Sequence, residues 1–411
     1  MSSLKETDPE VYDLVRAEES RQQDSIRLIA SENDTSQAVM EATGSVFTNK
    51  YSEGYPGKRY YEGQENTDKV EVLARERAEQ LYGAEHANVQ PYSGSPANLE
   101  AYYALLEVGD PILGMGLPYG GHLTHGWGVN FSGRFFDAHH YAVDEETERL
   151  DYDAIAEQAR EVEPEMIVCG ASAYPRTIDF ERFAEIADDV DAYLLADIAH
   201  ISGLVASGVH PSPVPVADVV TTTTHKTLRG PRGGLILCKD EHAKAIDKAV
   251  FPALQGGPHM HAVAAAAVAF KEALQPDFKE YSEQIVRNSR AMAEELKKRD
   301  FRLVAGGSDN HLVLIDMVAS RDIGGKPAST ALSEAGIVSN ANSIPFDERG
   351  PFDPSGLRIG TSSVTTRGMK EDEMTQIVEW IDAAIEARDD EDALASIRRE
   401  VREFCTDYPT P

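Results

Sequence analysis

The stretch VVTTTTHKTLRGPRGG (residues 219–234) places one lysine, Lys226, directly after a β-branched run. Residues 219–224 have the composition of a strand, and residues 233–238 (GGLILC) predict the next one. We therefore expect Lys226 in a turn between two buried strands. Loss of hydration favours the neutral amine of a lysine, which is the form that attacks a carbonyl carbon. A solvent-facing lysine is the simpler alternative, but the chain has no other lysine between Lys69 and Lys226.

Strand and helix patterns alternate on both sides of this stretch. Short apolar runs at 111–115, 166–169 and 192–196 predict strands, with helical patterns between them. Continuous apolar strands separated by helices are typical of a mostly parallel sheet covered by helices on both faces. Such sheets bind ligands beyond the carboxyl ends of their strands. We predict an α/β fold, with a large domain of this kind over residues 63–277.

The two ends of the chain have other patterns. Residues 8–30 are charged and periodic, which predicts an N-terminal helix, and residues 31–63 are rich in Ser, Asn, Gly and Tyr, which predicts a long functional loop. We assign residues 1–62 to this helix and an active-site arm. A long polar-faced helix over about 278–299 precedes further strand-like runs. Residues 278–411 are therefore predicted to form a smaller C-terminal α/β domain.

Composition restricts the classes of partner. The 411-residue chain has a formal net charge of −31, so nucleic acid and anionic membranes are disfavoured as partners. We also find no signal-like apolar core and no run of membrane-spanning length. The three cysteines, Cys169, Cys238 and Cys405, are far apart and have no metal-binding spacing, which favours a reducing, cytoplasmic setting. The spread of acidic residues indicates either a solvated surface that keeps the protein dispersed or adaptation to high salt, which screens their mutual repulsion; we favour adaptation to salt because lysine is scarce.

Three polar features follow predicted strands in chain order. Ser93-Gly94-Ser95 precedes a helix and could bind phosphate through free amides and hydroxyls, although plain helix capping by serine is the alternative. Asp197 ends an apolar run, with His200 close by, and could hold a cationic ring nitrogen or cap the next helix. Lys226 is the third feature. A phosphate site, an acidic partner for a ring nitrogen and a Schiff-base lysine are the three fixtures that pyridoxal phosphate requires.

Two further motifs carry polar side chains that could reach a ligand. His122 and His125 lie in the glycine-flanked loop 120–126, and one of them could stack on an aromatic cofactor. Both could instead ligate a metal, but no third ligand is evident nearby, and we predict no metal site. Arg358 lies between short apolar residues, where it could clamp a carboxylate with two parallel hydrogen bonds or form a structural ion pair.

Taken together, these motifs resemble those of serine hydroxymethyltransferases, a family of pyridoxal-phosphate enzymes of fold type I. The resemblance covers nearly the whole chain, to about Tyr408, and its most specific parts are ASEN (30–33), the arm motif of residues 48–61, the loop 120–126, the stretch 219–234 and QGGP (255–258). It implies a cytoplasmic transferase of one-carbon and amino-acid metabolism. Such an enzyme moves a one-carbon unit reversibly between serine and a tetrahydrofolate-type pterin, giving glycine.

The resemblance also implies roles for individual residues. For the cofactor, it implies Lys226 as the Schiff-base lysine, Asp197 at the ring nitrogen, His122 stacked on the ring, Ser172 and His200 near the ring hydroxyl, and Ser93, Gly94, Ser95 and His225 at the phosphate. Tyr51, Gly256 and Gly257 would reach the site from a neighbouring subunit of a homodimer or tetramer. For the substrates, it implies Ser31, His200 and Arg358 at the carboxylate, Glu53 as the acid–base group near the serine hydroxyl and the pterin, and Tyr51 as a further substrate contact. It also implies Tyr61 and Thr223 as catalytic support, and Tyr60, Leu117, Gly121, Leu123 and Asn342 at the pterin.

The chain departs from the family pattern near several of these residues. Tyr92 stands where histidine is usual, Pro96 replaces glutamine, Glu62 and Gln64 replace glycine and cysteine, Pro118 and Tyr119 differ before the glycine pair, and His259 replaces an apolar residue. Because some of these positions border the substrate region, an aldolase or hydroxymethyltransferase for threonine or α-methylserine is the alternative enzyme. A non-catalytic cofactor-binding protein is a more distant alternative, since it would be expected to lose Lys226, Asp197 or Glu53.

Overall fold

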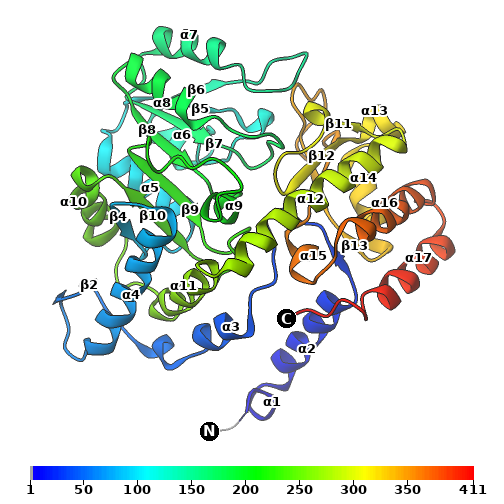
Figure 1. Cartoon of the computed structure of the whole chain (residues 1–411), viewed down its shortest axis with the longest axis horizontal. Coiled ribbons are helices and arrows are strands. Elements are labelled where there is room, and N and C mark those ends of the chain that lie inside the picture. The colour runs from blue at the N-terminus through cyan, green and yellow to red at the C-terminus, as the bar shows by residue number, and fades with distance from the viewer. Residues whose placement is uncertain (1–2) are drawn as a thin grey trace.

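The structure, a computed structural model, describes residues 3–411. Its largest sheet has the strand order β4-β10-β9-β8-β7-β5-β6 and lies in the large lobe of Figure 1. The strands are β4 (His86–Asn88), β5 (Pro111–Met115), β6 (Asp137–Tyr141), β7 (Met166–Gly170), β8 (Tyr193–Asp197), β9 (Val219–Thr223) and β10 (Gly234–Cys238). Strands β6, β5, β7, β8 and β9 pair in parallel, whereas β10 is antiparallel to both of its neighbours. The predicted mostly parallel sheet is confirmed.

Helices cover both faces of this sheet. They are α4 (Glu65–Tyr82), α5 (Gly94–Leu105), α6 (Phe131–Phe135), α7 (Tyr152–Val162), α8 (Phe180–Asp189), α9 (Ser202–Ala206), α10 (Asp240–Lys248) and α11 (Met260–Ala273), with the short turns η2 (Leu117–Tyr119) and η3 (Ala249–Leu254). Successive residues of one strand enter different cores: Ile112 packs in one cluster and Leu113 in another. Burial on both faces explains why these strands read as continuous apolar runs.

The C-terminal part of the chain forms a second lobe around the antiparallel sheet β11-β12-β15-β14. Its elements are α12 (Pro276–Lys298), β11 (Arg302–Leu303), η4 (Val304–Gly306), β12 (Leu312–Asp316), α13 (Met317–Arg321), α14 (Gly325–Glu334), β13 (Ile337–Val338), β14 (Asn340–Asn342), β15 (Gly356–Gly360), α15 (Ser362–Thr366), α16 (Glu371–Glu386) and α17 (Glu391–Phe404). This lobe has its own core. Helix α12 runs between the two lobes in Figure 1 and contacts elements of both.

The N-terminal region corrects two sequence-based expectations. The helix predicted over 8–30 is α2 (Pro9–Gln23), preceded by α1 (Leu4–Thr7), and it ends before β1 (Ile26–Arg27), which pairs in parallel with β13. Ile26 and Leu28 are fully buried in the core of the C-terminal lobe, which favours an extended segment there. The predicted loop 31–63 contains α3 (Gln37–Thr43), η1 (Val46–Asn49) and the hairpin strands β2 (Gly54–Tyr55) and β3 (Lys58–Arg59).

Helices α1 and α2 project from the rest of the molecule in Figure 1, and neither has a buried residue. Only the C-terminal end of α2 is tied to the C-terminal lobe, where Gln23 donates to the Cys405 carbonyl at 2.7 Å and its own carbonyl accepts from Arg367 at 3.0 Å. The hairpin of β2 and β3 projects from the opposite end of the same N-terminal region. Within residues 3–411, no helix has the length and apolar character that a membrane crossing requires.

Candidate active site

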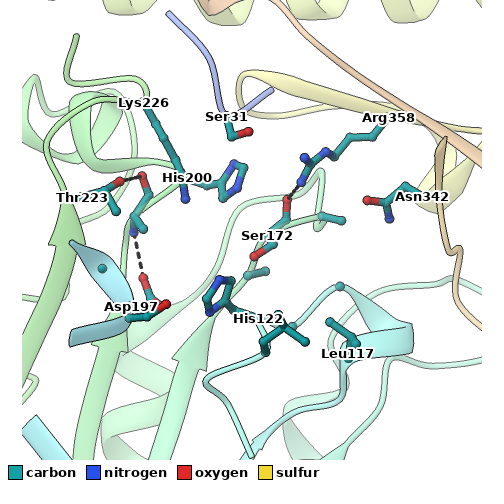
Figure 2. A pocket seen from close by; sticks show the side chains of 18 of the residues that line it. Ser31, Leu117, His122, Ser172, Asp197, His200, Thr223, Lys226, Asn342 and Arg358 are labelled. Carbon is teal, nitrogen blue, oxygen red and sulfur yellow. Dashed lines mark hydrogen bonds between the residues drawn. The ribbon is translucent and has the colours of Figure 1, made fainter. Parts of the chain in front are cut away.

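A cavity of about 510 Å³ opens where the carboxyl ends of the large sheet face the C-terminal lobe. Figure 2 shows Lys226, His200 and Arg358 pointing into it from one side and Asp197 and His122 from the other. Most of the predicted site residues line this one cavity: Ser31, Ser93, Gly94, Ser95, Leu117, Gly121, His122, Leu123, Ser172, Asp197, His200, Thr223, His225, Lys226, Asn342 and Arg358. The location agrees with the rule for ligand sites in parallel sheets.

Lys226 lies in the connection between β9 and β10, as the sequence predicts. Its half-buried side chain is in the cavity wall. Burial, together with the nearby cations Arg358 and Arg232, lowers the pKa of the amine to about 8, although the Asp197 carboxylate acts in the opposite direction. A substantial fraction of the amine is therefore neutral and nucleophilic near neutral pH.

Asp197 ends β8 and is held by three donors. His125 Nε2 lies 3.0 Å from Oδ2, Asn98 Nδ2 donates to the same oxygen at 2.9 Å, and the Ala199 amide donates to Oδ1 at 3.0 Å. Burial alone would raise the pKa of this carboxyl, but His125, His122 and Asn98 together keep the pKa below its usual value. Asp197 is thus a buried anion facing the cavity, which suits a cationic ring nitrogen.

His122 and His125 take different roles. The Nδ1 atom of His122 lies 2.7 Å from the Thr124 hydroxyl, and burial lowers the pKa of its ring to about 4. The sequence argument against a metal, that no third ligand is near, is wrong: ligand atoms of His122, His125 and Asp197 all lie within 4.8 Å of one another. His125 Nε2 is already within hydrogen-bond distance of Asp197, and His122 Nδ1 is within hydrogen-bond distance of the Thr124 hydroxyl.

The start of α5 presents free hydroxyls to the cavity. Ser93 is the N-cap residue of α5, but its side chain makes no capping hydrogen bond, so the alternative of plain capping does not apply. Gly94 lies so close to Thr223 that an added Cβ would meet Thr223 Cγ2 at 2.7 Å. Nearby, His225 has a buried Nδ1 without a hydrogen-bond partner among the described residues. These amides, hydroxyls and the imidazole form a cradle of donors suited to an anion.

Arg358, on β15, faces the cavity from the C-terminal lobe. Its Nη1 donates to the Ser172 carbonyl at 2.8 Å and its Nε to Asn340 Oδ1 at 3.2 Å. No carboxylate within residues 3–411 forms an ion pair with it, so the alternative of a structural ion pair does not apply. Burial lowers the pKa of the guanidinium to about 10, which still leaves it charged near neutral pH. A half-buried cation without a counterion is suited to binding an incoming carboxylate.

Six predicted residues lie outside the cavity, in a group that we call the arm cluster: Tyr51, Glu53, Tyr60, Tyr61, Gly256 and Gly257. Tyr51 and Tyr61 donate to the two oxygens of Glu53 at 3.1 and 3.3 Å. A Cβ on Gly256 would lie 3.4 Å from Glu53, and one on Gly257 the same distance from the Tyr51 ring. The arm therefore packs on the segment after η3, and Tyr51, Tyr60 and Tyr61 remain 57%, 72% and 49% exposed.

Tyr92 and His259, two of the residues that depart from the family pattern, contact each other. The Tyr92 ring stacks on His259 with centroids 4.3 Å apart and an angle of 9°. The Tyr92 hydroxyl also donates to the Gly257 carbonyl at 3.0 Å. The backbone amide of Tyr92 donates to Gln255 Oε1 at 2.9 Å. This pair supports the glycine segment of the arm cluster and does not line the cavity.

Sequence reasoning missed several residues that orient the site. Asn98 and His125 fix Asp197, and His311 lies behind His200 with 3.2 Å between His311 Nε2 and His200 Nδ1. The one available signal for Asn98 is its position one helical turn after Gly94, which places both on the same face of α5. The partner of His200 comes from a distant part of the chain, and no local pattern indicates it.

The sheet topology, the lysine at the end of β9 and the aspartate at the end of β8 define a fold-type I enzyme of the pyridoxal-phosphate class. A family model described as "Serine hydroxymethyltransferase" matches residues 4–381. Three curated proteins with that same name are also similar: the one from Sorangium cellulosum is 59% identical over 411 residues, covering 100% of this chain and 97% of the relative. Those from Acidothermus cellulolyticus and Desulfotalea psychrophila are 57% and 56% identical, covering 100% of this chain and 97% and 96% of the relatives.

The chain belongs to the serine hydroxymethyltransferase family. It is therefore a one-carbon transferase that acts on serine, as the sequence predicted. The expected fold class is confirmed as well.

Proposed function

We propose that the chain transfers the hydroxymethyl carbon of serine to a tetrahydrofolate-type pterin, with pyridoxal phosphate held at Lys226. The observation that supports this proposal is that three groups suited to pyridoxal phosphate line the same cavity. These are the amine of Lys226, the carboxylate of Asp197 and the donor cradle at the start of α5. Arg358 adds a fixed cation for the substrate carboxylate in the same cavity.

Each polar part of pyridoxal phosphate has a matching group. The Lys226 amine suits its carbonyl carbon, and Asp197 suits its ring nitrogen. The phosphate suits the cradle, because the Ser93 hydroxyl is free of capping and His225 Nδ1 is buried without a partner. His122 is available to lie against the ring, and Ser172 and His200 line the side where a ring hydroxyl would fall. The residues present therefore fit the group.

When bound, pyridoxal phosphate supplies an electron-withdrawing ring that stabilises negative charge on the α-carbon of an amino acid. Asp197 supports this by keeping a negative charge beside the ring nitrogen in a buried place. Arg358 and Ser31 bind and orient the substrate carboxylate. Thr223 lies between the cradle and Lys226, with its hydroxyl donating to the Ala199 carbonyl at 3.3 Å, and supports the position of both.

The pterin subsite is proposed at one rim of the cavity. Leu117, Gly121, Leu123 and Asn342 line the cavity there, with Leu117 in η2 of the large lobe and Asn342 in β14 of the C-terminal lobe. Tyr60 is the fifth proposed pterin residue and belongs to the arm cluster.

We further propose that two copies of the chain share each site. The arm cluster lies outside the cavity of its own chain, yet Glu53, Tyr61 and Tyr51 are the groups assigned to proton transfer and substrate binding. Supply of Tyr51, Glu53, Tyr60, Tyr61, Gly256 and Gly257 by a second copy would resolve this separation. The exposed tyrosines and helix α2, which has no buried residue, support such a homodimer, or a tetramer of two such pairs.

The setting is proposed to be a cytoplasm of high salt. All three cysteines are buried and unpaired, which is compatible with reducing conditions. The net charge of −31 is large for a chain of 411 residues and requires screening.

The function is tested by giving purified enzyme serine with and without tetrahydrofolate, and threonine without it, and measuring glycine. We expect glycine from serine to depend on the pterin and to exceed glycine from threonine. Cleavage of threonine without pterin as the dominant activity would show that the chain serves another β-hydroxy amino acid.

A further inference from the structure

An aromatic pair, Tyr119 and Phe346, crosses the boundary between the two lobes. Tyr119, one of the residues that depart from the family pattern, lies in η2 together with the proposed pterin residue Leu117. Phe346 follows Asn342, another proposed pterin residue, by four positions. The two rings are tilted by 60°, with centroids 5.3 Å apart. Leu117 and Asn342 lie at the same end of the cavity in Figure 2, and neither ring of the pair lines the cavity itself. The pair therefore lies just outside the proposed pterin subsite.

The Tyr119 ring is held by the large lobe. It is half-buried and packs against the main core of that lobe. A Cβ on Gly116 would meet the Tyr119 ring at 2.9 Å, so the ring covers the backbone of this glycine. Tyr119 is thus a fixed support for the second aromatic ring.

Phe346 has a backbone conformation that phenylalanine rarely adopts. Its φ is 58°, in the left-handed region. The Asp347 amide donates to the Ile344 carbonyl at 3.1 Å, so residues 344–347 form a turn with proline at its second position and Phe346 at its third. Turns with proline there and a positive φ at the next residue are of type II, which favours glycine or asparagine at the third position. Residues strained in this way are concentrated at ligand sites, where the surrounding structure holds them in place.

The turn that carries Phe346 is fixed at its base. The Asp347 carboxylate accepts from the Ser355 amide at 2.9 Å and the Ser355 hydroxyl at 2.6 Å, and from the Arg349 amide at 2.9 Å. Ile344 is buried in a small core shared by both lobes. The side chain of Phe346 nevertheless remains 41% exposed. The protein therefore keeps an apolar ring in place at the surface without burying it.

We propose that Phe346, supported by Tyr119, forms an aryl subsite for the aromatic ring on the side chain of the pterin cosubstrate. This proposal rests on the proposed function and adds the residues that select pterins with an aryl side chain. In tetrahydrofolate an aminobenzoyl ring follows the pterin ring after a short linker, so a pterin bound at the rim carries this ring to the neighbouring surface. Aromatic pairs gain affinity beyond the apolar area that they bury. Because Phe346 is already fixed, it loses little conformational entropy on binding.

Three variants separate the aryl subsite from a structural role. Phe346→Gly removes the ring and suits the positive φ, so this variant is expected to fold. Phe346→Tyr keeps an aromatic ring in the same place. Phe352→Gly is the matched control, because Phe352 lies in the same connection between β14 and β15 and is 96% exposed. The two probes are tetrahydrofolate and 6-methyltetrahydropterin, which has a methyl group in place of the aryl side chain.

Isothermal titration calorimetry on enzyme loaded with pyridoxal phosphate and glycine measures the affinity for both probes. We expect Phe346→Gly to weaken binding of tetrahydrofolate about tenfold and to leave binding of 6-methyltetrahydropterin within about twofold of the wild type. Phe346→Tyr and Phe352→Gly should bind both probes as the wild type does.

The aryl subsite is refuted if Phe346→Gly binds tetrahydrofolate as tightly as the wild type. Equal weakening of both probes would also overturn it, because the pair would then only hold the lobes together. A loss in Phe352→Gly as large as that in Phe346→Gly would contradict the assignment to Phe346. A wild-type enzyme that binds neither probe would instead refute the proposed function, and the aryl subsite with it.

Discussion

Lys226 lies between one anion, Asp197, and two cations, Arg232 and Arg358, in a wall that largely excludes water. This setting makes the amine a nucleophile near neutral pH. It predicts how the cofactor-free protein takes up pyridoxal phosphate. Below a pKa of about 8 most of the amine is an ammonium without a free electron pair, and above it most of the amine is neutral.

The uptake rate constant should therefore rise with pH by about tenfold per unit at low pH and level off near pH 8. Stopped-flow absorbance at a series of pH values measures this, with Lys226→Arg as the control that lacks a titrating amine. A rate that keeps rising to about pH 10, the range of an ordinary lysine, would contradict the assigned surroundings.

Residues that face the cofactor site could be predicted from the sequence, whereas the residues that orient them through hydrogen bonds could not. Lys226, Asp197 and the serines of the cradle follow strands or precede a helix, so their places at the sheet edge could be predicted. The partners Asn98 and His311 come from other segments, and only the folded chain shows that they meet Asp197 and His200.

Among the elements, the contact between α5 and β9 shapes the phosphate cradle. Gly94 opens α5, and its missing side chain leaves room for the Thr223 methyl group of β9. Gly94→Ala should push the helix start away and weaken binding of pyridoxal phosphate by about tenfold, because the anion site depends on the position of the first amides.

Thr223→Ser removes the obstructing methyl group and keeps the hydroxyl. Combined with Gly94→Ala, it should restore most of the lost affinity, which equilibrium titration of the cofactor-free variants measures. Independent, additive losses in the double variant would show that the two side chains do not interact at the cradle.

Strands buried on both faces could be predicted because their apolar runs are continuous, as at β7 and β8. Strand β6 could not: its sequence Asp137–Tyr141 is polar and lies at the sheet edge, where only one residue is buried. The sequence pattern extends the N-terminal helix too far, because Ile26 and Leu28 continue the apolar period although they pack as an extended segment.

At the scale of the whole molecule, the question is whether one chain or two chains build each active site. The arm cluster lies outside the cavity of its own chain, which favours a site shared by two chains. Glu53→Gln and Lys226→Ala should each be inactive alone. In a mixed dimer, the copy that keeps Lys226 would receive an intact Glu53 from the other copy. Unfolding and refolding the two variants together, or co-expressing them, should therefore restore activity in the hybrid. Hybrids isolated by different affinity tags and found inactive would place Glu53 in the site of its own chain.

The charge of −31 predicts a second property of the whole molecule. Mutual repulsion destabilises the compact chain in dilute buffer, and salt screens it. The melting temperature should therefore rise steadily from low to multimolar potassium chloride. Full stability in dilute buffer would contradict adaptation to salt.

Lys226 is the residue proposed to carry the cofactor, and a covalent label identifies the lysine that does so. The enzyme is loaded with pyridoxal phosphate, reduced with borohydride, digested and analysed by mass spectrometry. We expect the pyridoxyl group on the peptide that contains Lys226, and no label in that peptide for Lys226→Ala. Stoichiometric label on another lysine, or none at all after loading, would contradict it.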